Sequence, residues 1–469
     1  MTIGGVVIEE GRHIRTVRGI GYRLLQAIAL VLPPSLYVLY IEHYAVNVLV
    51  GDDWAVEVPT VHFGLHGGRD FFWLLWRQYN EHRMVAPRFL FVVLGDLTSL
   101  NTKSIMLFSA AMFIATYLML IVLVRRYCDH WLGPIGLLLL GAVWFSLSDY
   151  ESALLSTQLA WYLVLFFLMA CMLALSRRRL SWWVLVVAGV IAILGSYSSL
   201  QGLILWPLGL IYLYRRRSEL PRTRLTMALW IVLACATTAF YFWDYNFTQA
   251  QGPSSFSTVI HDPLGSLKFF FVVVGNVVPS DAPSAYGWHV FVGVLVTLGA
   301  IAVLVVSVGE VRRDGLGALV PLPAALAAFG LIFDVLTTIG RAEIGETGAL
   351  APRYTMPTLL VLIGMTVYLF ARASALRLSR GWRSAALAAA TVLLSALLVA
   401  QVAISTGWGL QGGSVTRASR EEAVVTLERL PELPKAEAER EVVANIYPSL
   451  AALEPLLAIA RQDHDSGAR

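Results

Sequence analysis

The stretch KSIMLFSAAMFIATYLMLIVLVRR, Lys103–Arg126, decides the class of this protein. Between its basic ends it carries no charged residue, and it is long enough to cross the hydrocarbon core of a bilayer, which takes about 20 helical residues. A basic pair directly after such a run is typical of a span that ends on the cytoplasmic side. We therefore expect a membrane helix here, and the rest of the chain repeats the pattern.

The composition of the whole chain agrees with a protein that lies mostly in lipid. Of the 469 residues, 57% are hydrophobic and only 14% are charged, and the mean hydropathy is +0.68. A soluble chain is nearer a quarter charged, because its surface must carry polar groups. The composition therefore excludes an ordinary soluble enzyme, a disordered scaffold and a nucleic-acid binder, and the net charge of +4 bears on membrane orientation.

Long apolar runs predict an all-α polytopic membrane protein with about eleven transmembrane helices. The predicted spans are 24–41, 104–124, 131–148, 153–175, 182–197, 199–214, 225–243, 288–309, 318–338, 356–371 and 384–405. The run 264–278 is nearly as long, but a crossing there would break the alternation of arginine clusters. We expect it to be a re-entrant or interfacial helix.

Arginine clusters fall on alternate turns between these spans, and the positive-inside rule places such turns in the cytoplasm. The clusters are Arg125–Arg126, Arg177–Arg179, Arg215–Arg217, Arg222 with Arg224, Arg312–Arg313, and Arg372, Arg377, Arg380 and Arg383. The basic N-terminus, residues 1–23, joins that side. The sequence therefore predicts a transmembrane domain over 24–405 and an extracytoplasmic helical tail over 406–469.

The first outer loop, 42–103, is too long to be a simple connection. Its segments 71–79 and 87–100 are short and amphipathic, which is typical of helices at the membrane surface. Asp52 and Asp53 form an acidic pair in this loop. Adjacent carboxylates resist ionising together, which suits one of them to act as a general base. A solvated turn with a helix N-cap is the alternative, because Asp favours both positions.

Arginines beside this pair are candidates for binding phosphate. Arg83 and Arg88 flank the start of the second surface helix, and guanidinium groups match phosphate oxygens. A lipid phosphate would lie at that depth. The alternatives are contact with bulk anionic headgroups and pairing with Glu81.

A second polar group follows much later, with Asp334 in a span and then Arg341, Arg353 and Tyr354. A carboxyl group inside a membrane is costly, so we expect Arg341 or Arg353 to be its partner, in a functional site or a structural ion pair. Other polar residues of the outer turns favour a wet cavity at the outer leaflet, with interhelical hydrogen bonding as the alternative. These are Asp149, Tyr150, Glu151, Gln158, Ser198, Ser199 and Gln201.

The first loop also holds four of the nine histidines, and these could bind a divalent cation together with the acidic pair. They are His43, His62, His66 and His82. Their spacing is not that of a known metal motif, so surface histidine is the alternative, and the metal, like any other cofactor, stays unassigned. The sequence also has no phosphate-binding lysine loop and no dinucleotide glycine fingerprint. A donor substrate would then arrive through the lipid or from outside.

In this arrangement of loop, surface helices, spans and tail, the chain resembles the GT-C fold glycosyltransferases. It is also similar to bacterial multipass proteins related to that superfamily, through three short stretches. The matching residues are Asn80, Glu81, His82, Arg83, Pro87 and Arg88; Gly202, Leu203, Trp206 and Pro207; and Gly340, Arg341, Ala342, Arg353 and Tyr354. Pro352 departs from the serine that those relatives carry before the arginine.

The resemblance implies a glycosyltransferase of the bacterial plasma membrane, with the N-terminus cytoplasmic and the C-terminus extracytoplasmic. Its donor would be a polyprenyl-phosphate-linked sugar and its acceptor an envelope glycan or lipid. Asp53 or Asp52 would act as the base. The residues that would bind the substrate or its phosphate are Arg83, Arg88, Arg353, Tyr354, Arg341, Glu81 and His82.

Two other functions fit the same sequence. A transporter or flippase of lipid-linked substrates would use Asp334 and the broken region 182–214, although no internal repeat supports it. A non-catalytic envelope assembly protein would use its tail to bind a partner.

Overall fold

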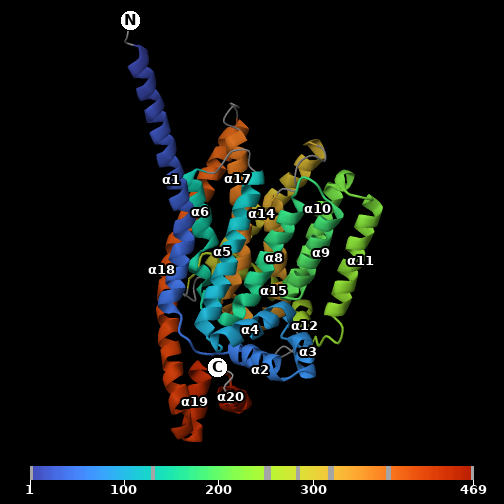
Figure 1. Cartoon of the computed structure of the whole chain (residues 1–469), viewed down its shortest axis with the longest axis vertical. Helices are drawn as coiled ribbons and strands as arrows, with labels where there is room; N and C mark the ends of the chain where they lie inside the picture. The colour runs from blue at the N-terminus through green and yellow to red at the C-terminus, as the bar shows by residue number, and fades with distance from the viewer. Residues whose placement is uncertain are drawn as a thin grey trace.

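The computed structural model describes residues 4–127, 133–247, 255–280, 286–314, 322–375 and 382–465. These residues form helices and one two-stranded hairpin (Figure 1). The beginnings of the predicted spans 131–148 and 318–338 lie outside the described residues. So do residues 1–3 of the predicted N-terminal segment and residues 466–469 of the predicted tail.

Eight helical stretches within these ranges are long and apolar enough to cross a membrane, which makes the chain an all-α polytopic membrane protein. The stretches are Ile20–Tyr44, Thr102–Tyr127, Ser156–Leu175, Thr223–Tyr241, Tyr286–Ser307, Leu322–Ala349, Pro352–Arg372 and Ala388–Glu432. They belong to α1 (Gly4–Tyr44), α5 (Thr102–Tyr127), α8 (Leu159–Leu175), α11 (Thr223–Tyr241), α14 (Tyr286–Asp314), α15 (Leu322–Arg341), α17 (Thr355–Ala375) and α18 (Trp382–Arg429).

Three of the eleven predicted spans are too short to cross by themselves, so that count is not confirmed. They are α6 (Pro134–Trp144), α9 (Trp182–Ser196) and α10 (Leu205–Arg215). At about 1.5 Å per residue, helices of 11 or 15 residues fall well short of a hydrocarbon core of about 30 Å. Polar residues end α6, because the Ser146 hydroxyl accepts the Ser148 N–H and starts a 3-10 turn (Leu147–Asp149), which α7 (Tyr150–Ala153) follows.

The run 264–278, expected to be re-entrant or interfacial, forms α13 (Pro263–Gly275), and a short helix, α12 (Ser255–His261), precedes it. The 13 residues of α13 are too few to cross, and the helix packs against α14 and α15. Its last turn is buried, and a Cβ on Gly275 would lie 1.8 Å from the His289 carbonyl oxygen. The C-terminal end of α13 therefore enters the helical body and does not lie flat on its surface.

The first outer loop contains more structure than its amphipathic pattern predicts. Its two expected surface helices are α3 (Arg69–Trp76) and α4 (Val85–Thr98). A further helix, α2 (Asp52–His66), precedes them, and a hairpin of β1 (Gln78–Tyr79) and β2 (His82–Arg83) joins them. Asn80 has a φ of 46°, a conformation that asparagine tolerates at a tight turn.

At residue 405, the expected boundary between membrane domain and tail, the chain does not change element, because α18 continues through it as one helix of 48 residues. After it come α19 (Lys435–Asn445) and α20 (Leu450–Asp465). We call α19, α20 and the part of α18 after residue 405 the C-terminal arm. A small core joins the arm to α2; it includes Val50, Trp54, Val58, Ala423, Val442, Leu450 and Leu453.

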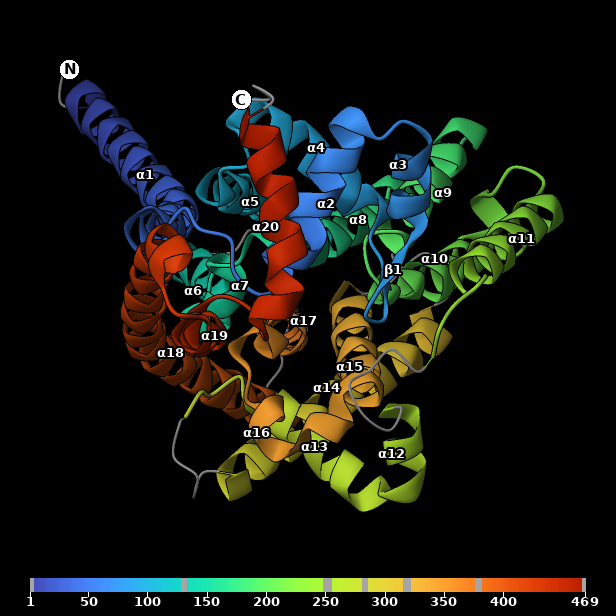
Figure 2. The ribbon, with the colours of Figure 1, turned by 90° about the horizontal axis from the view of Figure 1, so that it is seen from below.

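The N-terminal part of α1 lies at one end of the molecule, and α2–α4 and the arm lie at the other (Figure 1). Figure 2 views that second end, where α20 lies across α2. Three of the arginine clusters meet at one place, because Arg126 donates to Ser176 Oγ at 2.6 Å and Arg216 donates to the Arg177 carbonyl at 2.7 Å. The ends of α5, α8 and α10 therefore share one face, as alternate turns require.

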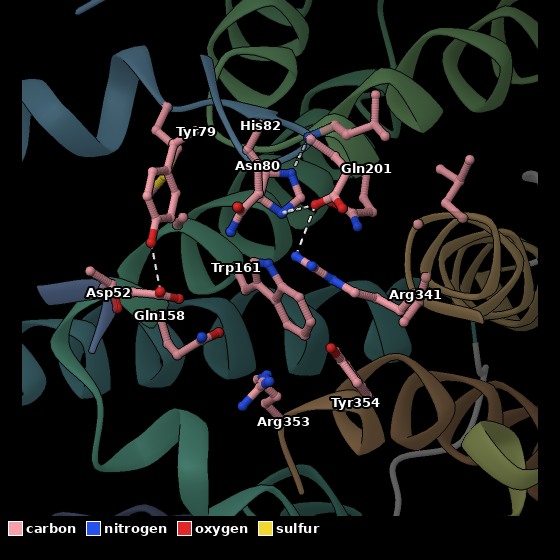
Figure 3. Close-up of a pocket in the computed structure, with 18 of the residues that line it drawn as sticks. Asp52, Tyr79, Asn80, His82, Gln158, Trp161, Gln201, Arg341, Arg353 and Tyr354 are labelled. Carbon is pink, nitrogen blue, oxygen red and sulfur yellow. Dashed lines mark hydrogen bonds and ion pairs between the residues drawn. The ribbon is translucent and has the colours of Figure 1, made fainter. Parts of the chain in front are cut away.

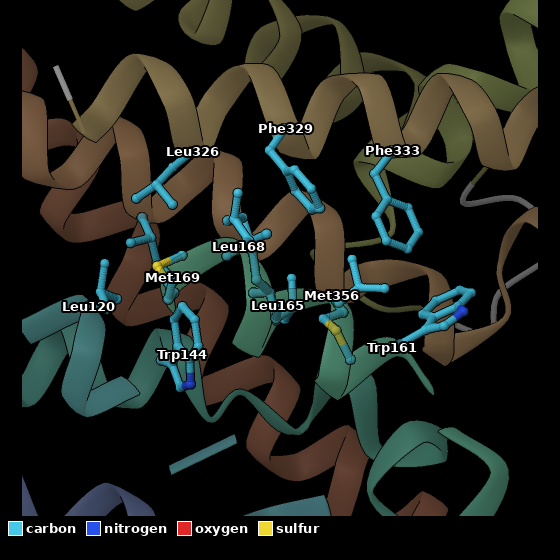
Figure 4. Packing of buried hydrophobic residues seen from close by; sticks show 14 of the residues in the cluster. Leu120, Trp144, Trp161, Leu165, Leu168, Met169, Leu326, Phe329, Phe333 and Met356 are labelled. Carbon is cyan, nitrogen blue, oxygen red and sulfur yellow. The ribbon is translucent and has the colours of Figure 1, made fainter. Parts of the chain in front are cut away.

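Between the two ends, α8 packs against α15 and α17 through large apolar side chains (Figure 4). Leu165, Leu168 and Met169 of α8 and Phe329 and Phe333 of α15 are all fully or almost fully buried. This core fixes the ends of α8, α15 and α17 relative to the first outer loop.

Candidate functional site

A cavity of about 220 Å³ lies where the hairpin of the first outer loop meets the ends of α8 and α15 and the start of α17 (Figure 3). Its polar and aromatic lining includes Asp52, Tyr79, Asn80, Glu81, His82, Gln158, Trp161, Gln201, Arg341, Arg353 and Tyr354. Residues distant in sequence therefore meet in one pocket. Six of the predicted site residues are among them: Asp52, Glu81, His82, Arg341, Arg353 and Tyr354.

Asp52 supplies an exposed carboxylate at the first turn of α2. The Tyr79 hydroxyl donates a hydrogen bond of 2.6 Å to Asp52 Oδ1, which fixes the carboxylate against β1. Burial and the nearby Asp52 charge raise the pKa of Tyr79, so the phenol keeps its proton and remains a donor. Within the described residues Asp52 Oδ2 makes no hydrogen bond, so it can accept a proton or a hydrogen bond from a ligand.

Glu81 joins the hairpin to α15 through an ion pair of 2.9 Å between its Oε2 and Arg341 Nη2. Burial raises the pKa of Glu81, and Arg341 opposes that shift. His82 Nε2 lies 4.0 Å from the same Glu81 oxygen, and the Leu200 N–H donates to His82 Nδ1 at 3.4 Å. Burial, with a smaller effect of Arg341, lowers the pKa of His82 to about 3. His82 is therefore neutral at pH 7, and its proton lies on Nε2.

Arg353 supplies the second cation, on the opposite side of the cavity. Its guanidinium pairs with Glu151 of α7 and lies 5.1 Å from the centre of the Tyr354 ring. The Trp161 ring is stacked with Tyr354, with ring centres 6.2 Å apart and planes at 29°. Trp161 also contacts Phe333 edge-on at 5.1 Å, so the core holds this aromatic wall in place.

Asp53, one of the two candidate bases, does not line the cavity. Its side chain is fully buried, and its Oδ1 accepts hydrogen bonds from the N–H and the hydroxyl of Thr157 at 3.2 and 3.1 Å. Arg420 of the C-terminal arm lies 4.0 Å from Asp53 Oδ2. Burial raises the pKa of Asp53, and Arg420 partly offsets the shift. The helical turn of α2 directs neighbouring side chains about 100° apart, which separates Asp52 from Asp53.

Arg83 is also absent from the cavity lining. Its guanidinium donates to the carbonyl oxygens of Trp76 and Tyr241, both at 2.6 Å, and to that of Trp243. The backbone has therefore taken up the donors expected to hold phosphate. In this position Arg83 ties the hairpin to the end of α11.

Arg88 has a comparable structural role. It is buried and donates to the carbonyl oxygens of Leu74, Leu75 and Arg77, which lie at the C-terminal end of α3. A cation there satisfies carbonyls that a helix end leaves unpaired and favours the helix dipole. Burial lowers the pKa of Arg88 to about 10, so it still carries its charge at neutral pH.

Asp334 does not pair with either expected arginine. It is fully buried, and its Oδ2 accepts a hydrogen bond of 3.0 Å from the Thr358 hydroxyl of α17. The residue therefore joins α15 to α17 below the cavity.

The expected divalent cation has no corresponding cluster in the described ranges, where no three His, Cys, Asp or Glu side chains are placed to hold a metal. Of the four histidines, His82 lines the cavity, and His62 and His66 lie side by side on α2 with ring centres 5.4 Å apart.

Some lining residues had no sequence signal strong enough to select them. Tyr79 belongs to a strand of only two residues, and Trp161 lies in a sequence that predicts an apolar span. The polar residues Gln158 and Gln201, which favour a wet outer cavity in the sequence, do line it. The spacing Gln158-x₂-Trp161 places both on one helical face and could have linked Trp161 to that cavity.

Comparison of the chain with protein-family models, with curated proteins and with solved structures finds no match.

Proposed function

We propose that the protein transfers a sugar from a polyprenyl-phosphate-linked donor to an acceptor of the cell envelope, at the outer face of a bacterial plasma membrane. The observation that carries the proposal is the meeting of one exposed carboxylate, Asp52, with two guanidinium groups, Arg341 and Arg353, in one cavity at the ends of membrane helices. A substrate anchored in lipid would carry its headgroup near the ends of such helices.

In this reaction Asp52 is the general base. The acceptor oxygen forms a bond to the anomeric carbon of the sugar, the bond from that carbon to the phosphate oxygen breaks, and the acceptor proton passes to Asp52. Its hydrogen bond from Tyr79 leaves one carboxylate oxygen able to take the proton. A base positioned in this way contributes about 10²–10⁴-fold to the rate.

Arg341 and Arg353 act on the leaving group. Each uses one terminal nitrogen to pair with a carboxylate, Arg341 with Glu81 and Arg353 with Glu151, so their other N–H groups can donate to a phosphate. Negative charge grows on the departing phosphate oxygen, and fixed cations there lower the barrier. Trp161 and Tyr354 offer an apolar wall to the sugar ring.

The test compares Asp52→Asn with Asp96→Asn, which removes an exposed carboxylate of α4 that does not line the cavity. Each variant is the sole copy in the cell, and envelope glycans are analysed together with the amount of protein in the membrane. We expect Asp52→Asn to remove a specific sugar and Asp96→Asn to keep it. Unchanged glycan in a well-expressed Asp52→Asn strain would contradict the catalytic role and favour a transport or assembly function.

A further inference from the structure

A second hollow, separate from the cavity above, lies on the first outer loop and measures about 470 Å³. Asp70 of α3, Arg77 just after α3 and Asp244 just after α11 line it. All three side chains are exposed, and in the described part of the chain none makes a side-chain hydrogen bond or a salt bridge. The groove therefore presents two carboxylates and one guanidinium that remain available to a ligand.

The walls of this groove are fixed to each other by polar contacts. Gln78 Nε2 donates to the Asn246 carbonyl and the Asn246 N–H donates to Gln78 Oε1, both at 2.9 Å. The buried Arg83 guanidinium lies 4.8 Å from the centre of the Trp76 ring and forms part of the floor. The three unpaired charges therefore surround a preformed hollow and do not lie on separate mobile loops.

The surroundings place the groove where a membrane surface would be. Along α11, apolar side chains such as Val232 and Phe240 are exposed, as expected of a lipid-facing helix. Where α11 ends, large aromatic side chains are about 70% exposed on both sides of the groove: Phe72, Trp73, Trp243 and Phe247. Aromatic rings gather at the headgroup level of bilayers. The groove charges therefore lie at the depth of lipid headgroups.

We propose that this groove binds the headgroup of a bilayer phospholipid that carries a phosphate and a primary amine, as in phosphatidylethanolamine. Arg77 donates to the phosphate, Asp70 and Asp244 accept from the ammonium group, and the acyl chains lie along α11. Guanidinium groups suit phosphate, and an ammonium group has three N–H donors for carboxylates. A choline headgroup has no N–H to donate, and a glycerol headgroup has no positive charge to offset the two carboxylates.

The test uses the purified full-length protein in mixed micelles that contain dioleoyl phosphatidylethanolamine, phosphatidylcholine or phosphatidylglycerol. Lipid retained by each protein molecule is counted by native mass spectrometry. We expect phosphatidylethanolamine to be retained about threefold more than the other two, because partly exposed charge pairs each contribute under about 1 kcal/mol. Equal retention of the three lipids, or a preference for phosphatidylglycerol, would overturn the proposal.

Variants identify the groove as the site. Asp70→Asn combined with Asp244→Asn should abolish the preference for the amine lipid, and Arg77→Gln should lower retention of all three lipids. Asp96→Asn and Arg69→Gln remove exposed charges of α4 and α3 that do not line the groove, and should change nothing. A preference that survives the double Asp variant would place the bound lipid elsewhere and refute the assignment.

Discussion

Glu57 lies one helical turn after Asp53 and is fully buried, and within the described residues neither of its carboxylate oxygens makes a hydrogen bond. A buried ionised carboxylate without partners costs several kcal/mol, so such a group keeps its proton. Burial raises the pKa of Glu57 well above its ordinary value, and the neighbouring Asp53 charge raises it further. The acidic face of α2 therefore holds a neutral Glu57 beside Asp53 and Arg420.

Replacing this carboxyl by an amide tests that protonation state. A raised pKa in the folded protein means that stability is fully present below the unfolded pKa and falls as the pH rises above it. Glu57→Gln removes that loss, so we expect its Tm to exceed that of the parent by about 2–4 °C at pH 8 and to match it at about pH 4, below the ordinary pKa of a glutamate. Thermal unfolding across this pH range measures the difference.

The control is Glu422→Gln, an exposed carboxyl of α18, which should leave the pH profile unchanged. A Tm for Glu57→Gln below that of the parent at pH 8 would mean that Glu57 is ionised and paired, contrary to this account.

At the scale of single residues, sequence reasoning selected charged residues of which some line the cavity, but it did not predict the direction in which each side chain points. Arginine and aspartate near a membrane are costly, and that cost alone selected Arg341, Arg353 and Asp52. It could not separate them from Arg83 and Arg88. The carbonyl oxygens that accept hydrogen bonds from those two guanidinium groups lie at helix ends, and only the fold brings them close.

Among the elements, the C-terminal arm and α2 stabilise each other through a shared core and an ion pair. The part of α18 after residue 405 brings Arg420 to Asp53, and the small core around Trp54 and Val442 lies beside that contact. Thr157 binds the Asp53 carboxylate and also lines the cavity. The arm therefore supports the start of the helix that carries Asp52.

Arg420→Gln should loosen this contact, because it leaves the buried Asp53 without a cation. Removing one partner of a buried pair costs about 3 kcal/mol or more. Limited proteolysis should release the arm faster in Arg420→Gln than in Arg440→Gln, which removes an exposed charge of α19. Equal cleavage rates in the two variants would show that Arg420 does not secure the arm.

The same elements show what the sequence determines about the fold. Long apolar runs such as Lys103–Arg126 predict their helices, because a single segment in lipid can satisfy its own backbone N–H and C=O groups only as a helix. The pattern cannot show that α18 runs on past residue 405, because a polar helix continuing from an apolar one has no start signal. It also cannot show that Ser146–Asp149 ends a helix early, since the same polar residues are equally compatible with the last turn of a complete span.

For the whole molecule, the central feature is a helical body with the arginine-rich ends of α5, α8 and α10 on one side and the cavity at the other end. If the arginine turns are cytoplasmic, as their charge predicts, the cavity and the arm face the outside. A cysteine-free parent with Glu428→Cys should then react with a membrane-impermeant maleimide on intact cells. Arg178→Cys should react only after permeabilisation, and the reverse pattern would overturn the orientation.

The central claim is that this cavity recognises a lipid-linked phosphate. Its most direct measurement is the affinity of the purified protein for undecaprenyl phosphate compared with undecaprenol, the same chain without the charge. The account predicts tighter binding of the phosphate, and about tenfold weaker phosphate binding in Arg353→Gln, since losing one charge-assisted contact costs about 1.4 kcal/mol. Equal affinity for the two lipids, or phosphate binding unchanged by Arg353→Gln and Arg341→Gln together, would contradict it.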